Sequence, residues 1–262
     1  MISSLNNGQI KYISLLQKKS RARKEENAFI IEGIKMFEES RSQGNLVKAY
    51  FSEEFYNKKY KEDSEFFRDL SYEIIQDSIF RKVSETSTPQ GVLAIVERPN
   101  YKLSDIISDT NCNLLLLENI QDPGNLGTMV RTAEGAGFTG IILSNDSVDM
   151  LNPKVIRSTM GAIYRMPFVY VDNFEQTLRE LQNNNISIYA AYLEGAKFYD
   201  DVKYSKRCGI LIGNESKGLK DTTVRIADKL IKIPMEGQVE SLNAAVAAAI
   251  LMYEVSRQNR HS

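Results

Sequence analysis

The sequence has few of the side chains that most hydrolytic and metal-dependent enzymes use. Its 262 residues include one histidine, His261, near the C-terminal end. This excludes most Ser-His, Cys-His and zinc constellations, and we expect no metal site. Any chemistry must therefore use carboxylates, arginine, lysine, tyrosine, serine, asparagine, the backbone or a cofactor.

Cysteine and long apolar runs are also scarce. The two cysteines, Cys112 and Cys208, do not form a C-x-x-C pair and are too few for a disulfide framework. Each lies beside an expected core strand, which favours a buried free thiol. No stretch approaches about 18 apolar residues, and the N-terminus has no apolar run of signal-peptide length. We therefore expect a cytoplasmic protein that does not enter a membrane.

The charge balance gives no global argument for a nucleic-acid partner. The formal net charge is -1, so an RNA surface must be a local patch. Residues 1–24 carry no acidic side chain but include Lys11, Lys18, Lys19, Arg21, Arg23 and Lys24. This basic arm is suited to phosphate contact, although a solvated helix face is an equally simple interpretation.

Residues 114–138 predict a buried strand, a tight loop and a helix. The apolar run 114–117 is typical of a parallel strand that is covered on both faces. The segment 122–125, Asp-Pro-Gly-Asn, has turn chemistry, and a helix is expected over residues 128–136. Asn125 then lies in the loop and Arg131 on the helix. A glycine-containing loop that leads into a helix is a common binding place in α/β proteins.

Two later segments repeat this arrangement. The apolar strand 210–212 leads into Gly213, Asn214, Glu215, Ser216, Lys217 and Gly218. A strand that ends near Pro234 is followed by a loop, and an alanine-rich helix is expected over residues 241–257. Other nucleotide motifs are absent, because no G-x-G-x-x-G follows a first strand and no P-loop is present.

These three segments resemble the motifs of the SpoU/TrmH family of RNA ribose 2′-O-methyltransferases. The pattern N-x-G-x-x-x-R-x-A at residues 125–133 is similar to the first motif, and G-x-E-x-x-G at residues 213–218 to the second. The pattern P-M-x-G-x-x-x-S-L-N-x-x-x-A at residues 234–247 is similar to the third. All three occur in order, and each follows an expected strand.

The predicted fold class is α/β, in two domains. Alternating strands and helices follow the basic arm of residues 1–24, and residues 25–98 resemble an L30e-like substrate-binding domain. The break around Pro99 separates it from residues 110–262, where strands alternating with helices predict a mostly parallel sheet. The resemblance, not the periodicity, implies a C-terminal trefoil knot in this SPOUT methyltransferase domain.

The resemblance also implies the site residues. The cofactor is S-adenosylmethionine, and the expected catalytic set comprises Asn125, Arg131, Glu215, Ser241 and Asn243. Arginine is almost always protonated, so Arg131 is better suited to an RNA phosphate or a forming alkoxide than to a base role. Ser241 has a simpler alternative role as a helix N-cap, and Glu215 as an acceptor of backbone N–H groups in a turn.

The cofactor is expected to meet backbone groups of Gly213, Ile233 and Leu242. Family members are usually homodimers whose active site borrows from both chains, so a homodimer is implied here. The expected function is methylation of a ribose 2′-hydroxyl, more specifically in 23S ribosomal RNA. Transfer RNA as the substrate, or a non-catalytic RNA-binding member of the family, are the alternatives.

Overall fold

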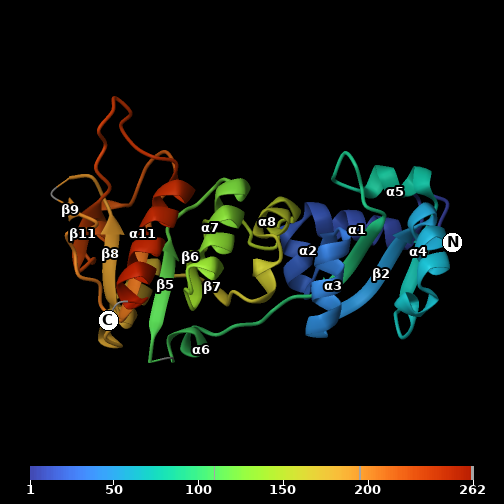
Figure 1. Cartoon of the computed structure of the whole chain (residues 1–262), viewed down its shortest axis with the longest axis horizontal. Coiled ribbons are helices and arrows are strands. Elements are labelled where there is room, and N and C mark those ends of the chain that lie inside the picture. The colour runs from blue at the N-terminus through green and yellow to red at the C-terminus, as the bar shows by residue number, and fades with distance from the viewer. Residues whose placement is uncertain (109, 195, 261–262) are drawn as a thin grey trace. The chain divides into compact units, whose positions relative to one another are not determined.

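A computed structural model describes residues 1–108, 110–194 and 196–260, so His261 lies outside the described residues. The chain forms two compact units (Figure 1). The first comprises Met1–Pro99 and Leu151–Tyr164, and the second comprises Asn100–Met150 and Arg165–Ser262. The segment Leu151–Tyr164 therefore packs with the N-terminal unit although strands of the second unit flank it in sequence. The domain boundaries inferred from sequence stay a prediction.

The first unit is built on a four-stranded sheet in the order β1-β4-β2-β3. Its strands are β1 (Ala28–Glu32), β2 (Leu46–Ser52), β3 (Tyr72–Ile75) and β4 (Val92–Glu97). Its helices are α1 (Gly8–Lys18), α2 (Ser20–Glu25), α3 (Ile34–Gln43), α4 (Glu53–Glu62), α5 (Asp77–Val83) and α8 (Pro153–Thr159), with 3-10 turns η1 (Ser64–Phe67) and η2 (Ala162–Tyr164). β4 is antiparallel to both of its neighbours, and β2 is parallel to β3.

The basic arm is part of this unit's core. Ile10, Ile13 and Leu16 recur at helical spacing on α1 and pack with buried residues of the sheet and α5. The arm is two helices, α1 and α2, with the break at Lys19. Arg23 is buried, and its guanidinium donates to the carbonyls of Leu16 and Gln17 at the end of α1. It therefore caps a helix and is not a phosphate ligand.

The second unit contains a seven-stranded sheet in the order β7-β6-β5-β10-β8-β11-β9, and every pairing in it is parallel. The mostly parallel sheet predicted from sequence is confirmed. The strands are β5 (Cys112–Leu117), β6 (Gly140–Ser144), β7 (Phe168–Val171), β8 (Ser187–Ala191), β9 (Lys197–Phe198), β10 (Arg207–Ile212) and β11 (Lys229–Lys232). The helices are α6 (Leu103–Ile107), α7 (Pro123–Gly135), α9 (Phe174–Asn183), α10 (Asp221–Val224) and α11 (Ala244–Arg260).

Helices cover both faces of this sheet, which explains why β5 is apolar at almost every position. Cys112, Leu114 and Leu116 share one core cluster with side chains of α6 and α9. The helices α7 and α11 lie side by side and pack against each other, and α11 also contacts β10 (Figure 1). The parallel strands thus end at one edge of the sheet, where the loops that carry the three motifs begin.

Both cysteines are free and buried, as predicted. Burial raises the pKa of the Cys208 thiol to about 12, so this thiol stays protonated at neutral pH. Within the part of the chain that the structure describes, every helix is too short or too polar to cross a bilayer.

Candidate active site

Glu215, in the loop after β10, holds the loop after β5. Its carboxylate accepts hydrogen bonds from the backbone N–H groups of Gln121 (3.1 Å) and Asp122 (3.0 Å) and from the side-chain amide of Asn125 (3.1 Å). Partial burial alone would raise the pKa of Glu215, but these donors and its own backbone N–H hold the pKa below its usual value. Glu215 is therefore ionised and already well supplied with donors.

Asn125 extends this contact to a third segment. It lies in the first turn of α7, not in the preceding loop as predicted, because Asp122 is the N-cap and accepts from the Asn125 N–H at 2.7 Å. Pro123 at the first helical position completes this start signal. The Asn125 side-chain oxygen accepts from the side-chain amide of Asn243 at 3.0 Å. Residues more than 100 positions apart are thereby joined.

Asn243 begins the C-terminal helix. Its side-chain oxygen accepts from the backbone N–H groups of Ala245 (2.9 Å) and Val246 (3.3 Å), which have no partner within the helix. The helix α11 starts at Ala244, so the predicted start at Ser241 was wrong by three residues. Asn243, not Ser241, is the N-cap, and the simpler role considered for Ser241 is removed.

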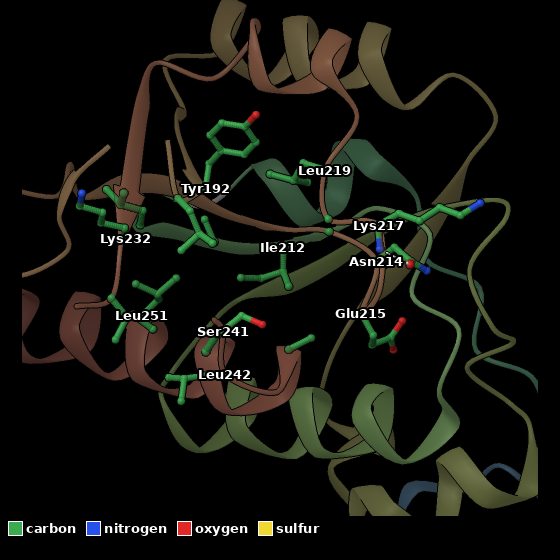
Figure 2. A pocket seen from close by; sticks show the side chains of 18 of the residues that line it. Tyr192, Ile212, Asn214, Glu215, Lys217, Leu219, Lys232, Ser241, Leu242 and Leu251 are labelled. Carbon is green, nitrogen blue, oxygen red and sulfur yellow. Dashed lines mark hydrogen bonds between the residues drawn. The ribbon is translucent and has the colours of Figure 1, made fainter. Parts of the chain in front are cut away.

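A cavity of about 390 Å³ lies where the second and third motif segments meet. Its walls are the end of β8, the whole loop 213–219, the end of β11 with its following loop, and the first turns of α11. All three expected cofactor-contact residues, Gly213, Ile233 and Leu242, line it, as do Glu215 and Ser241. In Figure 2, Asn214, Glu215 and Lys217 lie at one end of this pocket and Lys232 and Leu251 at the other.

Gly213 is required by close packing of the backbone. A Cβ atom at this position would lie 2.4 Å from the carbonyl carbon of Gly218 and 2.4 Å from the amide nitrogen of Leu219. Real Cβ atoms do not approach backbone so closely, so any side chain would displace the loop. The loop is also closed on itself by two backbone hydrogen bonds between Asn214 and Gly218.

Arg131 stands apart from this network. It is exposed on α7 and, among the residues described, makes no hydrogen bond or ion pair. It lies six positions after Asn125, which places the two side chains roughly 120° apart around the helix axis. Ser241 is likewise exposed and has no hydrogen-bond partner within the described chain, although it lines the cavity. The structure therefore joins Asn125, Glu215 and Asn243, and leaves Arg131 outside.

Sequence reasoning missed three residues that support the site. Asp122 was assigned to a turn, although Asp followed by Pro is also a helix-start signal. The Asn214 side chain donates to the carbonyl of Asn119 at 2.8 Å and also accepts from two N–H groups of its own loop. Glu118 is buried, and its only signal in the sequence is an acidic residue directly after four leucines.

Comparison with known proteins identifies the family to which this chain belongs. The model of the SpoU rRNA Methylase family matches residues 113–253, and the model of the MRM3-like substrate binding domain matches residues 7–94. The chain belongs to the SpoU rRNA methylase family. This confirms the resemblance stated from the three motifs, and the second match covers most of the region likened to an L30e-like domain.

The similarity to individual relatives covers nearly the whole of this SpoU methylase chain. The 23S rRNA (guanosine(2553)-2′-O)-methyltransferase RlmP of Bacillus subtilis is 32% identical over 254 residues, which are 97% of this chain and 98% of the relative. The AdoMet-bound rRNA methyltransferase from Sinorhizobium meliloti has a TM-score of 0.86 at 28% identity, covering 98% of this chain and 97% of that one. The SpoU methyltransferase AviRb from Streptomyces viridochromogenes has a TM-score of 0.85 at 23% identity, with 98% and 100% coverage, and supports the fold.

The cavity fits S-adenosylmethionine. Its volume lies within the usual range for small-molecule sites, about 300–1,000 Å³. The walls combine apolar side chains such as Ile212, Leu219 and Leu251 with backbone groups of two loops, as a ligand with an aromatic base and a charged tail requires. Among residues 1–108, 110–194 and 196–260, no group of three or more His, Cys, Asp or Glu side chains could hold a metal ion.

Proposed function

We propose that this SpoU methylase is an S-adenosylmethionine-dependent methyltransferase that acts on a ribose 2′-hydroxyl of 23S ribosomal RNA. The observation that carries the proposal is that two motif loops and the start of α11 form one cavity, with the first motif bonded to its rim through Glu215. RlmP, which is named for this reaction on 23S rRNA, is similar along almost its entire length.

The cofactor would be held by the backbone around Gly213, Ile233 and Leu242. When bound, S-adenosylmethionine supplies a methyl group on a positively charged sulfur. The chain must then position the ribose hydroxyl in line with that methyl group and assist removal of its proton. Because Asn125 is fixed from both sides, by Glu215 and by Asn243, it is suited to orienting the ribose.

Glu215 is not the base in this proposal. Its pKa is held below the usual value and three donors from the loop after β5 and the start of α7 occupy its oxygens, so taking up a further proton is disfavoured. Arg131 remains the candidate for binding an RNA phosphate or stabilising the developing alkoxide, because a guanidinium is a permanent charge with a planar set of donors. Ser241 contacts the substrate from the cavity wall.

We further infer a homodimer in which Arg131 acts at the partner's site. Arg131 is exposed and lies away from Asn125 on its own helix, which suits a residue that reaches another chain. The adjacent helix α11 presents an apolar row at positions i, i+3, i+4 and i+7: Val246, Ala249, Ile250 and Tyr253. Val246 is 48% and Tyr253 50% exposed, so this row lacks a cover in the single chain.

The remaining parts of the proposal follow from the family. We infer a trefoil knot formed by the second and third motif loops, which line the same cavity. Residues 25–98 with the arm 1–24 serve as the RNA substrate-binding domain. An enzyme that modifies ribosomal RNA acts where ribosomes are assembled, and we place this one in the cytoplasm.

The test is methyl transfer from labelled S-adenosylmethionine to bulk ribosomal and transfer RNA from a strain that lacks the gene. We expect label on 23S RNA at the ribose, at least a hundredfold less with Arg131→Ala, and an intermediate rate with Arg131→Lys, which keeps the charge but not the planar donors. Label on transfer RNA alone would show that transfer RNA, not 23S ribosomal RNA, is the substrate. Cofactor and RNA binding without any transfer would favour a non-catalytic RNA-binding protein.

A further inference from the structure

Glu118 is a buried carboxylate at the end of the central strand β5. Only 2% of its surface is exposed, and it directly follows the four leucines 114–117. It belongs to none of the residue sets considered above for catalysis or cofactor contact. Its contacts lie instead with the loop 213–219, which forms one wall of the cofactor cavity.

Glu118 holds this loop at both ends. At the entry, the Glu118 backbone N–H donates to the carbonyl of Ile212, the last residue of β10, at 2.9 Å. At the exit, the Glu118 carboxylate oxygen Oε2 accepts from the backbone N–H of Lys220 at 3.0 Å. One residue therefore fixes the chain immediately before and immediately after the loop 213–219, whose seven residues all line the cavity.

The second carboxylate oxygen of Glu118 also binds the segment that follows the loop 213–219. Oε1 accepts from the hydroxyl of Thr223, which is fully buried, at 2.7 Å. The Lys220 ammonium lies 3.8 Å from Oε1 and 3.8 Å from a carboxylate oxygen of Asp146. The Lys220 side chain is 59% exposed, so this ion pair is screened by solvent, and the two hydrogen bonds to Glu118 are the stronger contacts.

Fold stability does not single out a carboxylate over any other hydrogen-bond acceptor at this position. Removing a carboxylate from water is expensive, so a buried carboxylate is retained where its oxygens accept hydrogen bonds. The neighbouring leucines show that β5 accepts apolar residues up to its end. The carboxylate does what leucine cannot: it accepts two hydrogen bonds from the segment that follows the cavity loop.

We propose that Glu118 is a positioning residue that keeps the loop 213–219 in its cofactor-binding shape before the cofactor arrives. A loop that is already ordered loses less conformational entropy when it binds its ligand. The residue acts through hydrogen-bond acceptance, not through its charge. This inference rests on the proposed binding of S-adenosylmethionine in the cavity.

The test compares Glu118→Leu with Glu118→Gln. Leucine removes both acceptors and leaves the Lys220 N–H without a partner, so we expect S-adenosylmethionine to bind about ten- to a hundredfold more weakly by calorimetry. Glutamine can accept from Lys220 with its oxygen and donate to Thr223 with its amide, so its affinity should stay within about threefold of wild type. Thr223→Val, which removes one bond at constant shape, should weaken binding severalfold, and Thr223→Ser should not.

Hydrogen exchange without cofactor gives a readout independent of activity. The amides of residues 213–219 should exchange faster in Glu118→Leu, while amides of the first unit and the affinity for RNA stay unchanged. Equal cofactor affinity in wild type, Glu118→Leu and Thr223→Val would overturn the inference, as would a Glu118→Gln variant as weak as Glu118→Leu. If Glu118→Leu does not fold, Thr223→Val decides alone. Failure of the wild-type chain to bind cofactor would instead overturn the proposed function.

Discussion

At the scale of single residues, the site depends on amide and carboxylate groups that bond to one another. Glu215, Asn125 and Asn243 form a continuous chain of hydrogen bonds of 3.0–3.1 Å between three segments of the second unit. Each side chain also bonds to backbone N–H groups or lies in a helix start. The structural and functional interpretations offered for Glu215 are therefore compatible, because a carboxylate that fixes a loop also fixes Asn125.

The ionisation of Glu215 predicts a specific loss of stability in acid. A carboxyl whose pKa is lower in the folded than in the unfolded protein stabilises the fold above its unfolded pKa, and this contribution is lost as pH falls through the folded pKa. The pKa of Glu215 is lowered from the usual 4.5. Wild type should therefore be more stable than Glu215→Gln at pH 6, and the difference should shrink as pH falls below about 4.5.

Urea unfolding at several pH values measures this difference. The exposed Glu236 offers a matched control, and Glu236→Gln should follow wild type at every pH. A stability difference between wild type and Glu215→Gln that is constant from pH 6 to pH 3 would contradict the assignment.

At the scale of elements, the start of α11 has two separable functions. The Asn243 side-chain oxygen caps the helix, while its amide group donates to Asn125. Aspartate is also a good N-cap but has no N–H group to donate. Stability and catalysis at this helix start can therefore be changed independently.

Asn243→Ala and Asn243→Asp should have different effects. Alanine removes the cap, which costs about 0.5–2 kcal/mol, so Tm should fall by a few degrees. Aspartate should keep Tm close to wild type but place a carboxylate against the Asn125 oxygen, and methyl transfer should fall at least tenfold. Scanning calorimetry and the transfer assay together measure both effects. If Asn243→Asp retains full activity, the contact with Asn125 has no catalytic importance.

At the scale of the whole molecule, a single chain does not bring Arg131 together with the other candidate catalytic residues. Arg131 points to solvent, while the cavity and its rim are formed by other segments of the same unit. The apolar row on α11 is adjacent to α7, the helix that carries Arg131, and Gly135 of α7 lies beneath Tyr253. A two-fold dimer through these helices would bring each Arg131 to the other chain.

Subunit mixing tests this arrangement. Arg131→Ala and Ser241→Ala chains should each be inactive, yet mixed dimers would contain one site with an intact arginine and an intact cavity. After random exchange, about a quarter of the wild-type rate should return, because half of the dimers are mixed and each has one complete site. Sedimentation should show a dimer that Val246→Asp or Tyr253→Asp disrupts. Absence of any restored activity after confirmed exchange would place Arg131 in its own chain's site.

Local patterns in the sequence were sufficient for most of the fold. Apolar strands that alternate with helices predicted the parallel sheet, because burial on both faces requires a continuous apolar run such as that of β5. The same reasoning misplaced the starts of α7 and α11. Asp122 and Asn243 cap these helices with their side chains, but the sequence allowed Asp122 to be a turn residue and Ser241 to be the cap of α11. Short elements such as β9 and α10 carry too few residues for a periodic signal.

The sequence by itself determined the α/β class and the three motif segments, because these depend on composition and spacing along the chain, whereas the expected cofactor-contact residues came from the family resemblance. Only the tertiary structure decided which of those residues meet. Asn125 and Asn243 are 118 positions apart, and no local pattern encodes their contact. Likewise, Arg23 became a buried cap and Glu118 an anchor of the cofactor loop, because burial and hydrogen-bond partners depend on how distant segments pack.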